Sequence, residues 1–60
     1  MDEHDVVRMK ESYGNIPKGE VGTIVYIYST NNVVVEVEFS NRERFEKVET
    51  IPLIKLEKVL

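Results

Sequence analysis

The chain has 60 residues, so it holds one domain at most and buries only about 60% of the surface that its unfolded form exposes. It contains no cysteine, which excludes disulfides, thiolate metal sites and a thiol nucleophile. Eight basic and eleven acidic residues give a net charge of −3, which disfavours attraction to nucleic acid.

The apolar residues are mostly β-branched. Ten are Val and five are Ile, whereas Ala and Gln, which favour helices, are missing. No apolar run approaches the ~20 residues that span a bilayer, and the first five residues are acidic where a secretory signal is basic. We therefore expect a soluble all-β domain in the cytoplasm, without membrane contact, in which residues 1–4 fray and residues 1–60 form a single domain.

The first predicted strand covers residues 5–10, because apolar and polar side chains alternate there. Val7 and Met9 are expected to face the core, between outward-facing basic residues. Residues 11–20 are rich in Gly, Pro, Ser and Asn and are predicted to form a long loop.

A second strand is predicted at residues 23–28, the run with the strongest β character. Gly19 and Gly22 stand just before it, where a positive φ or a close approach between strands is expected. The segment is not a phosphate loop, since the required Lys and Ser or Thr are missing and a strand follows it. Both faces of residues 23–28 are apolar or aromatic, so alternation does not say which one is exposed unless the strand is bulged.

The third strand, residues 33–39, shows the clearest alternation, after a predicted turn at residues 29–32. Its inward side chains are expected to be Val33, Val35, Val37 and Phe39. Glu36 and Glu38 are expected to face water, so Glu36→Lys should leave stability nearly unchanged while Val37→Asp should unfold the domain.

Residues 42–49 are predicted as a fourth, heavily charged strand, with a short helix as the alternative. Pro52 cannot donate a hydrogen bond to a sheet, so residues 51–55 are expected to form a 3₁₀-like turn. Residues 56–59 then form the last strand. The sum is an all-β, five-stranded SH3-like barrel with one 3₁₀ turn before the final strand.

Three stretches carry a resemblance to a known family: Asp5-Val6-Val7, the segment 17–25 with its Gly-x-x-Gly-Thr-Ile-Val step, and Val35-Glu36-Val37-Glu38-Phe39. Together with residues 53–59 they resemble a bacterial family of small proteins catalogued only as a domain of unknown function. In that family the position of Tyr26 is commonly charged, which implies that Tyr26 faces outward. Residues 42–49 depart from the family pattern.

Two weaker likenesses imply the same fold. Arg8, residues 10–13 and residues 21–23 are similar to the SH3-like stromal subunit of photosystem I. The glycine-bracketed strand turn is similar to a barrel module associated with ribosomes and RNA polymerase. Because the three resemblances imply different partners, the fold alone does not settle function.

No catalytic, cofactor or metal site is predicted. His4 lies among Asp2, Glu3 and Asp5, but neighbouring residues on a chain terminus cannot all turn toward one ion. Glu36 and Glu38 lie on one face of a strand about 7 Å apart, which a solvated strand face explains better than a carboxylate pair in a cleft. We therefore expect no enzymatic activity.

The candidate binding residues are the three tyrosines and two arginines. Tyr26 and Tyr28 on a strand, with Tyr13 in the long loop, have the composition of a protein-binding surface. Arg42 and Arg44, beside Phe45, are candidates for contact with a partner or with RNA, although interleaved acidic residues indicate a solvated face.

The expected function is therefore a non-catalytic protein-interaction module, an antitoxin or a small accessory subunit acting on one partner protein. The alternative is an RNA- or ribosome-associated module. The oligomeric state stays open between a monomer and a homodimer formed by pairing of strand edges.

Overall fold

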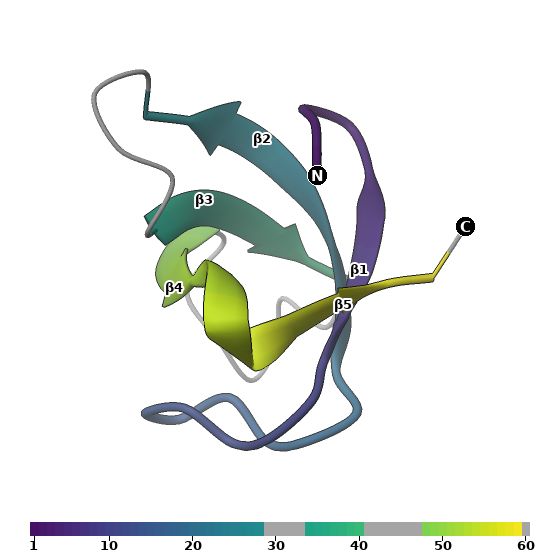
Figure 1. Cartoon of the computed structure of the whole chain (residues 1–60). Helices are drawn as coiled ribbons and strands as arrows, with labels where there is room; N and C mark the ends of the chain where they lie inside the picture. The colour runs from purple at the N-terminus through teal and green to yellow at the C-terminus, as the bar shows by residue number, and fades with distance from the viewer. Residues whose placement is uncertain (29–33, 41–47, 60) are drawn as a thin grey trace.

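The computed structural model describes residues 1–28, 34–40 and 48–59. Its elements in chain order are β1 (Val6–Met9), β2 (Val21–Ile27), β3 (Val34–Phe39), β4 (Val48–Pro52), the 3₁₀ turn η1 (Leu53–Lys55) and β5 (Leu56–Lys58). The five strands form one antiparallel sheet in the order β4-β3-β2-β1-β5 (Figure 1). The predicted fold class, all-β with five strands and a 3₁₀ turn before the last one, is confirmed.

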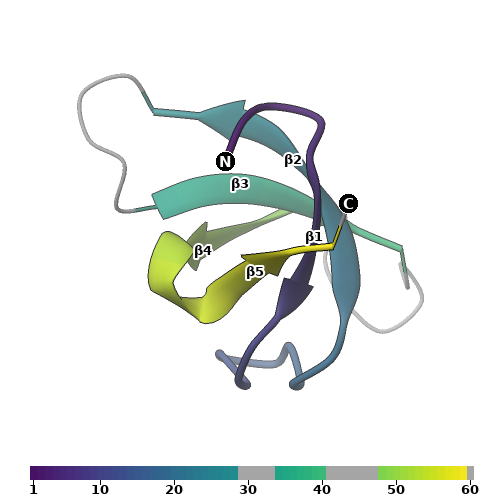
Figure 2. The same ribbon diagram turned by 45° about the vertical axis from the view of Figure 1, so that its right-hand side comes forward.

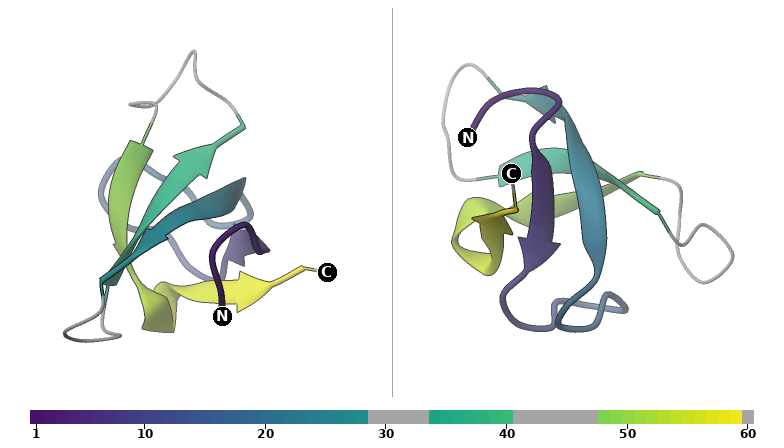
Figure 3. Two further views of the ribbon diagram at one scale, coloured as in Figure 1. Left: turned by 90° about the horizontal axis from the view of Figure 1, so that it is seen from above. Right: turned by 90° about the vertical axis from the view of Figure 1, so that its right-hand side faces the viewer.

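The sheet curls upon itself (Figures 2 and 3). Its outermost strands, β4 and β5, are joined by the three residues of η1 alone. A flat sheet would hold these strands four strand spacings apart, roughly 19 Å at the usual separation, which is more than such a short turn covers. The sheet therefore bends into a small barrel, and the inner face becomes the core.

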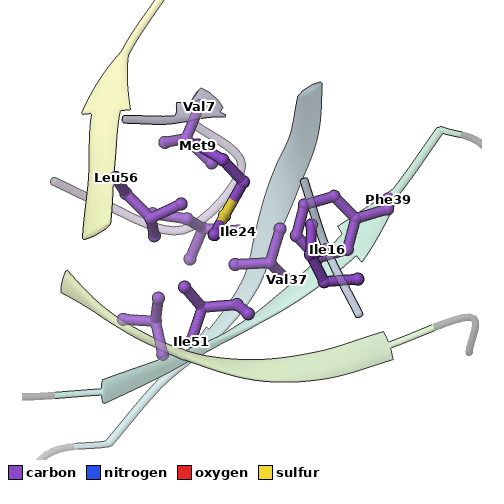
Figure 4. Packing of buried hydrophobic residues seen from close by; sticks show 9 residues of the cluster. Val7, Met9, Ile16, Ile24, Val37, Phe39, Ile51 and Leu56 are labelled. Atoms are coloured by element: carbon purple, nitrogen blue, oxygen red, sulfur yellow. The ribbon is translucent and has the colours of Figure 1, made fainter. Parts of the chain in front are cut away.

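Among the residues that the structure describes, nine apolar side chains are buried inside this curl (Figure 4). They are Val7, Met9, Ile16, Ile24, Val35, Val37, Phe39, Ile51 and Leu56. The predicted inward faces of the first and third strands are confirmed for every one of these residues that the structure describes; Val33 lies outside the described residues. Every strand contributes to the core, so no strand is stable alone.

The loop between β1 and β2 adds a core residue that the pattern did not predict. Tyr13 and Ile16 exchange two backbone hydrogen bonds of 2.9 Å, which turns the chain back at Gly14 and Asn15. The turn directs Ile16 inward, where it is 2% exposed. A loop that reads as polar in sequence thus still closes one end of the barrel.

Gly19 and Gly22 have the two roles that the sequence predicted. Gly19 has a φ of 92°, a conformation that L side chains rarely adopt. A Cβ on Gly22 would lie 2.7 Å from Val37 Cγ1 and 2.8 Å from the Glu38 carbonyl oxygen. Gly22 therefore lies where β2 and β3 approach each other closely.

β2 contains a register shift between Ile24 and Tyr26. Ile24 is fully buried, whereas Val25 and Tyr26 are both exposed, and Ile27 packs against the core again. This irregularity is the bulge that strict alternation could not place, and it turns Tyr26 outward.

The fourth strand differs from its prediction. β4 begins at Val48 and continues through Ile51 to Pro52, so the turn covers residues 53–55 rather than 51–55. Pro52 is tolerated because β4 is an edge strand and Pro52 is its last residue. The choice between strand and helix at residues 42–47 lies outside the described residues.

The N-terminal residues are hydrogen-bonded to the sheet. The Asp2 amide donates to Asp5 Oδ2 at 2.7 Å, and the His4 amide donates to the Ile24 carbonyl at 2.7 Å. His4 adopts a φ of 73° in this turn. Across residues 1–28, 34–40 and 48–59, we find no helix with the length and apolar character to cross a membrane.

Candidate functional site

The outer face of β2, β3 and β4 carries a row of polar and aromatic residues. Tyr26 lies directly opposite Glu36, and Glu36 lies directly opposite Thr50 on the other side. Because Val35 and Val37 point into the core, the residue between them points outward. The three side chains therefore meet on one solvent-facing surface.

Tyr28 joins this row from the end of β2. Its ring lies 5.1 Å from the Tyr26 ring, centroid to centroid, at an interplanar angle of 83°, which is the favourable edge-to-face arrangement. Its hydroxyl donates a hydrogen bond of 2.6 Å to Glu36 Oε2. Thr50 Oγ1 donates to the same oxygen at 2.5 Å. We call Tyr26, Tyr28, Glu36 and Thr50 the tyrosine face.

The Glu36 carboxylate organises the tyrosine face. Two hydroxyl donors, one just after β2 and one in β4, fix its position, and it in turn fixes the Tyr28 ring. The hydrogen bond to Glu36, followed by partial burial, raises the pKa of the Tyr28 hydroxyl above its usual value of 10. Tyr28 is therefore protonated, and can donate, throughout the physiological pH range.

Tyr26 is the exposed part of the tyrosine face. Half of its surface, 50%, is open to solvent, and the neighbouring Val25 is 37% exposed because of the bulge. Tyr28 and Val34 beside them are half-buried. An exposed aromatic ring next to a fixed carboxylate can stack on a partner group and accept hydrogen bonds from it.

Tyr13 is not part of the tyrosine face. It lies in the loop between β1 and β2, which Figures 1 and 2 show at the opposite end of β2 from Tyr26. It is 42% exposed there. Ile54, which is 75% exposed, lies at the same end of the barrel. It is placed there by the next residue, Lys55, whose carbonyl accepts a 2.7 Å hydrogen bond from the Lys10 amide at the start of the loop. The structure thus brings together two of the three predicted tyrosines.

The basic candidates divide in the same way. Arg42 and Arg44 lie outside the described residues. Of the five described cationic side chains, three pair with acids: Arg8 with Glu57 at 2.8 Å, Lys58 with Asp5 at 3.9 Å, and Lys55 with Glu11. The hydrogen bond and charge of Lys55 lower the pKa of Glu11 below its usual value of 4.5. In the described part of the chain, most cationic side chains therefore already form ion pairs with neighbouring carboxylates.

The acidic residues near His4 show no grouping suited to a metal. Among the described residues, three or more metal-ligating side chains are nowhere gathered around one point. Glu36 and Glu38 do share an outer face, as predicted. Glu36, however, is more than a solvated residue, since two hydroxyls donate to it.

Sequence reasoning identified Tyr26 and Tyr28 but not the residues that hold them. In the sequence, Glu36 and Glu38 look like two equivalent acidic residues that face water, and nothing marks Thr50 as part of a site. The relevant signal is the pairing register, which places an acid between a tyrosine and a threonine on three adjacent strands. That register depends on the bulge in β2, which the apolar pattern does not reveal.

The fold and the tyrosine face together define a small all-β domain, one curled antiparallel sheet of five strands with an exposed aromatic surface. A family model for a domain of unknown function, DUF4926, matches residues 3–58. The chain therefore belongs to the DUF4926 family. No curated protein and no solved structure shows a detectable match to it.

Proposed function

We propose that this domain is a non-catalytic protein-interaction module that binds one partner protein on the tyrosine face. The proposal is carried by the exposed Tyr26 ring, which stands against Tyr28 beside a carboxylate fixed by two hydroxyls. Tyr is enriched at protein interfaces because it gives a large contact area with little loss of side-chain entropy. The Tyr26 and Tyr28 rings are thus held in one arrangement before a partner binds.

The size of the molecule supports a role as a small accessory component. A standard interface buries about 800 Å² per partner, which is about a fifth of the 4022 Å² surface of this domain. One partner would then cover most of one face of the barrel. We propose that the domain acts in the bacterial cytoplasm as an antitoxin or as a small accessory subunit of one partner protein.

The alternative, an RNA- or ribosome-associated module, has less support. Phosphate binding needs available cations, and three of the five described cationic side chains are paired with carboxylates. The net charge of −3 also opposes it. Its support is the cluster of Arg42 and Arg44 in the sequence.

The test is affinity capture from the lysate of the host, with and without nuclease, using the wild type and two variants. Tyr26→Ser removes the exposed ring of the tyrosine face. Tyr13→Ser is the matched control, because Tyr13 is similarly exposed at the other end of the barrel. We expect one protein in near-equal amount with the wild type and with Tyr13→Ser, resistant to nuclease and lost with Tyr26→Ser.

Two results would contradict the proposal. Capture that is insensitive to Tyr26→Ser would move the binding surface away from the tyrosine face. Recovery of ribosomal or polymerase proteins that disappears with nuclease would favour the RNA-associated alternative.

A further inference from the structure

The Glu36 carboxylate has one oxygen in use and one available. Oε2 accepts the hydrogen bonds of both Tyr28 and Thr50. Within residues 1–28, 34–40 and 48–59, Oε1 accepts none and no cation pairs with this carboxylate. An ionised carboxylate has capacity for about four hydrogen bonds, so Glu36 retains room for a donor from outside the chain.

Tyr26 is the neighbour of Glu36 on the adjacent strand, on the same outer face of the sheet. Directly opposed residues on antiparallel strands hold their Cβ atoms about 5 Å apart, and Tyr26 and Glu36 are such a pair. A flat cation lying on the Tyr26 ring therefore comes within reach of the Glu36 carboxylate. Tyr28 and Thr50 hold the carboxylate in place, so little side-chain freedom is lost when the cation binds.

We propose that the tyrosine face binds an arginine side chain of the partner protein, with the guanidinium stacked on Tyr26 and donating to Glu36 Oε1. This inference rests on the proposed function, since the arginine belongs to the docked protein. Arginine fits better than lysine because its planar group stacks on an aromatic ring and donates from its edge at the same time. The negative charge of the domain favours the approach of such a partner.

The probe is a blocked Gly-Arg-Gly peptide titrated into ¹⁵N-labelled protein and followed by amide chemical shifts. The matched peptides replace Arg with Lys or with citrulline, which has the same shape but no charge. We expect weak saturable binding of the arginine peptide, with a Kd on the order of millimolar and the largest shifts at Tyr26, Glu36 and Thr50. The lysine peptide should bind more weakly, and the citrulline peptide should not bind.

Two substitutions assign the contact. Glu36→Gln keeps the size and the acceptor oxygen but removes the charge, and should weaken arginine binding about tenfold. Tyr26→Leu should weaken it roughly threefold to fivefold. Glu57→Gln is the control, because Glu57 is an exposed carboxylate that pairs with Arg8 on β1, and it should leave the affinity unchanged.

Besides a failure of the arginine peptide to bind, three results would overturn the inference: equal response to the arginine and citrulline peptides, equal loss with Glu36→Gln and Glu57→Gln, or shifts of the same amides with protein concentration alone. The last would show that a second copy of the chain occupies the face. If the arginine peptide fails to bind while capture of the partner still depends on Tyr26, the arginine assignment is wrong and the docking proposal stands.

Discussion

Gly22 is the glycine at which the fold leaves no room for a side chain. Its missing Cβ leaves the space taken by Val37 Cγ1 and the Glu38 carbonyl, and the second of these is backbone that cannot rotate away. Gly22→Ala should therefore push β2 away from β3 and reduce the free energy of unfolding by about 1–3 kcal/mol. Urea denaturation measures this loss.

Gly14→Asn is the matched control for that substitution. Gly14 has a φ of 58°, which Asn tolerates, and no atom lies within 4 Å of its added Cβ. Its midpoint of denaturation should stay close to that of the wild type. An equal loss in both variants would show that glycine flexibility, rather than the close approach at Gly22, controls stability.

Glu36 is the residue for which the structure changes a prediction most. On the sequence alone Glu36→Lys is expected to be neutral, but the carboxylate accepts hydrogen bonds from Tyr28 and Thr50. We now expect Glu36→Lys to reduce the free energy of unfolding by about 1 kcal/mol. Glu36→Gln keeps an acceptor oxygen and should lose less; identical stability of all three proteins in thermal denaturation would contradict this role.

The stability that Tyr28 contributes should depend on pH in the alkaline range. Because its pKa is raised in the folded state, its contribution to stability is complete below the unfolded pKa of about 10 and is lost as the pH rises through the folded pKa. Absorbance titration of the phenols should show a tyrosine that ionises above the usual phenol pKa. That step should disappear in Tyr28→Phe and move to lower pH in Glu36→Gln; a high-pH step that both variants keep unchanged would contradict it.

At the scale of the elements, the sequence predicts β1 and β3 well and β2 and β4 less well. β1 and β3 place apolar and charged residues alternately, so each inward face is unambiguous. β2 is apolar or aromatic on both faces, so periodicity could not locate the bulge after Ile24. β4 ends on Pro52, and the rule that proline interrupts a sheet does not apply to the last residue of an edge strand.

The strand register can be tested by replacing each of two valines, in separate variants, with Asp. Val37 is fully buried in β3, whereas Val25 lies at the bulge of β2 and is 37% exposed. Val37→Asp should abolish the dispersed amide spectrum of the folded domain, because the buried charge costs more than a domain of this size can lose. Val25→Asp should remain folded, and the opposite order of stabilities would show that the register is wrong.

At the scale of the whole molecule, the curl of the sheet decides which residues form a site. It brings the loop between β1 and β2 against η1, through the Lys10–Lys55 hydrogen bond and the Lys55–Glu11 ion pair. This places Tyr13 and Ile54 at one end of the barrel and leaves Tyr26 with Tyr28 toward the other. The three tyrosines, which the sequence presents as one set of candidates, therefore lie on two separate exposed surfaces.

The composition of the site was predictable, but its geometry was not. An exposed Tyr26 is what the family resemblance implies, whereas the strand pattern leaves the exposed face of this segment open. The grouping of Tyr28, Glu36 and Thr50 depends on pairings between residues 8 and 14 positions apart, which a pattern along one strand cannot supply. Long-range register is thus the physical information that the sequence pattern lacked.

The most direct test of the docking surface is to map the amide shifts of the ¹⁵N-labelled domain on addition of its captured partner. We predict that the largest changes fall on the tyrosine face, at Tyr26, Tyr28, Glu36 and Thr50. Changes centred instead on Tyr13 and residues 53–55 would place the partner at the other end of the barrel and contradict the account.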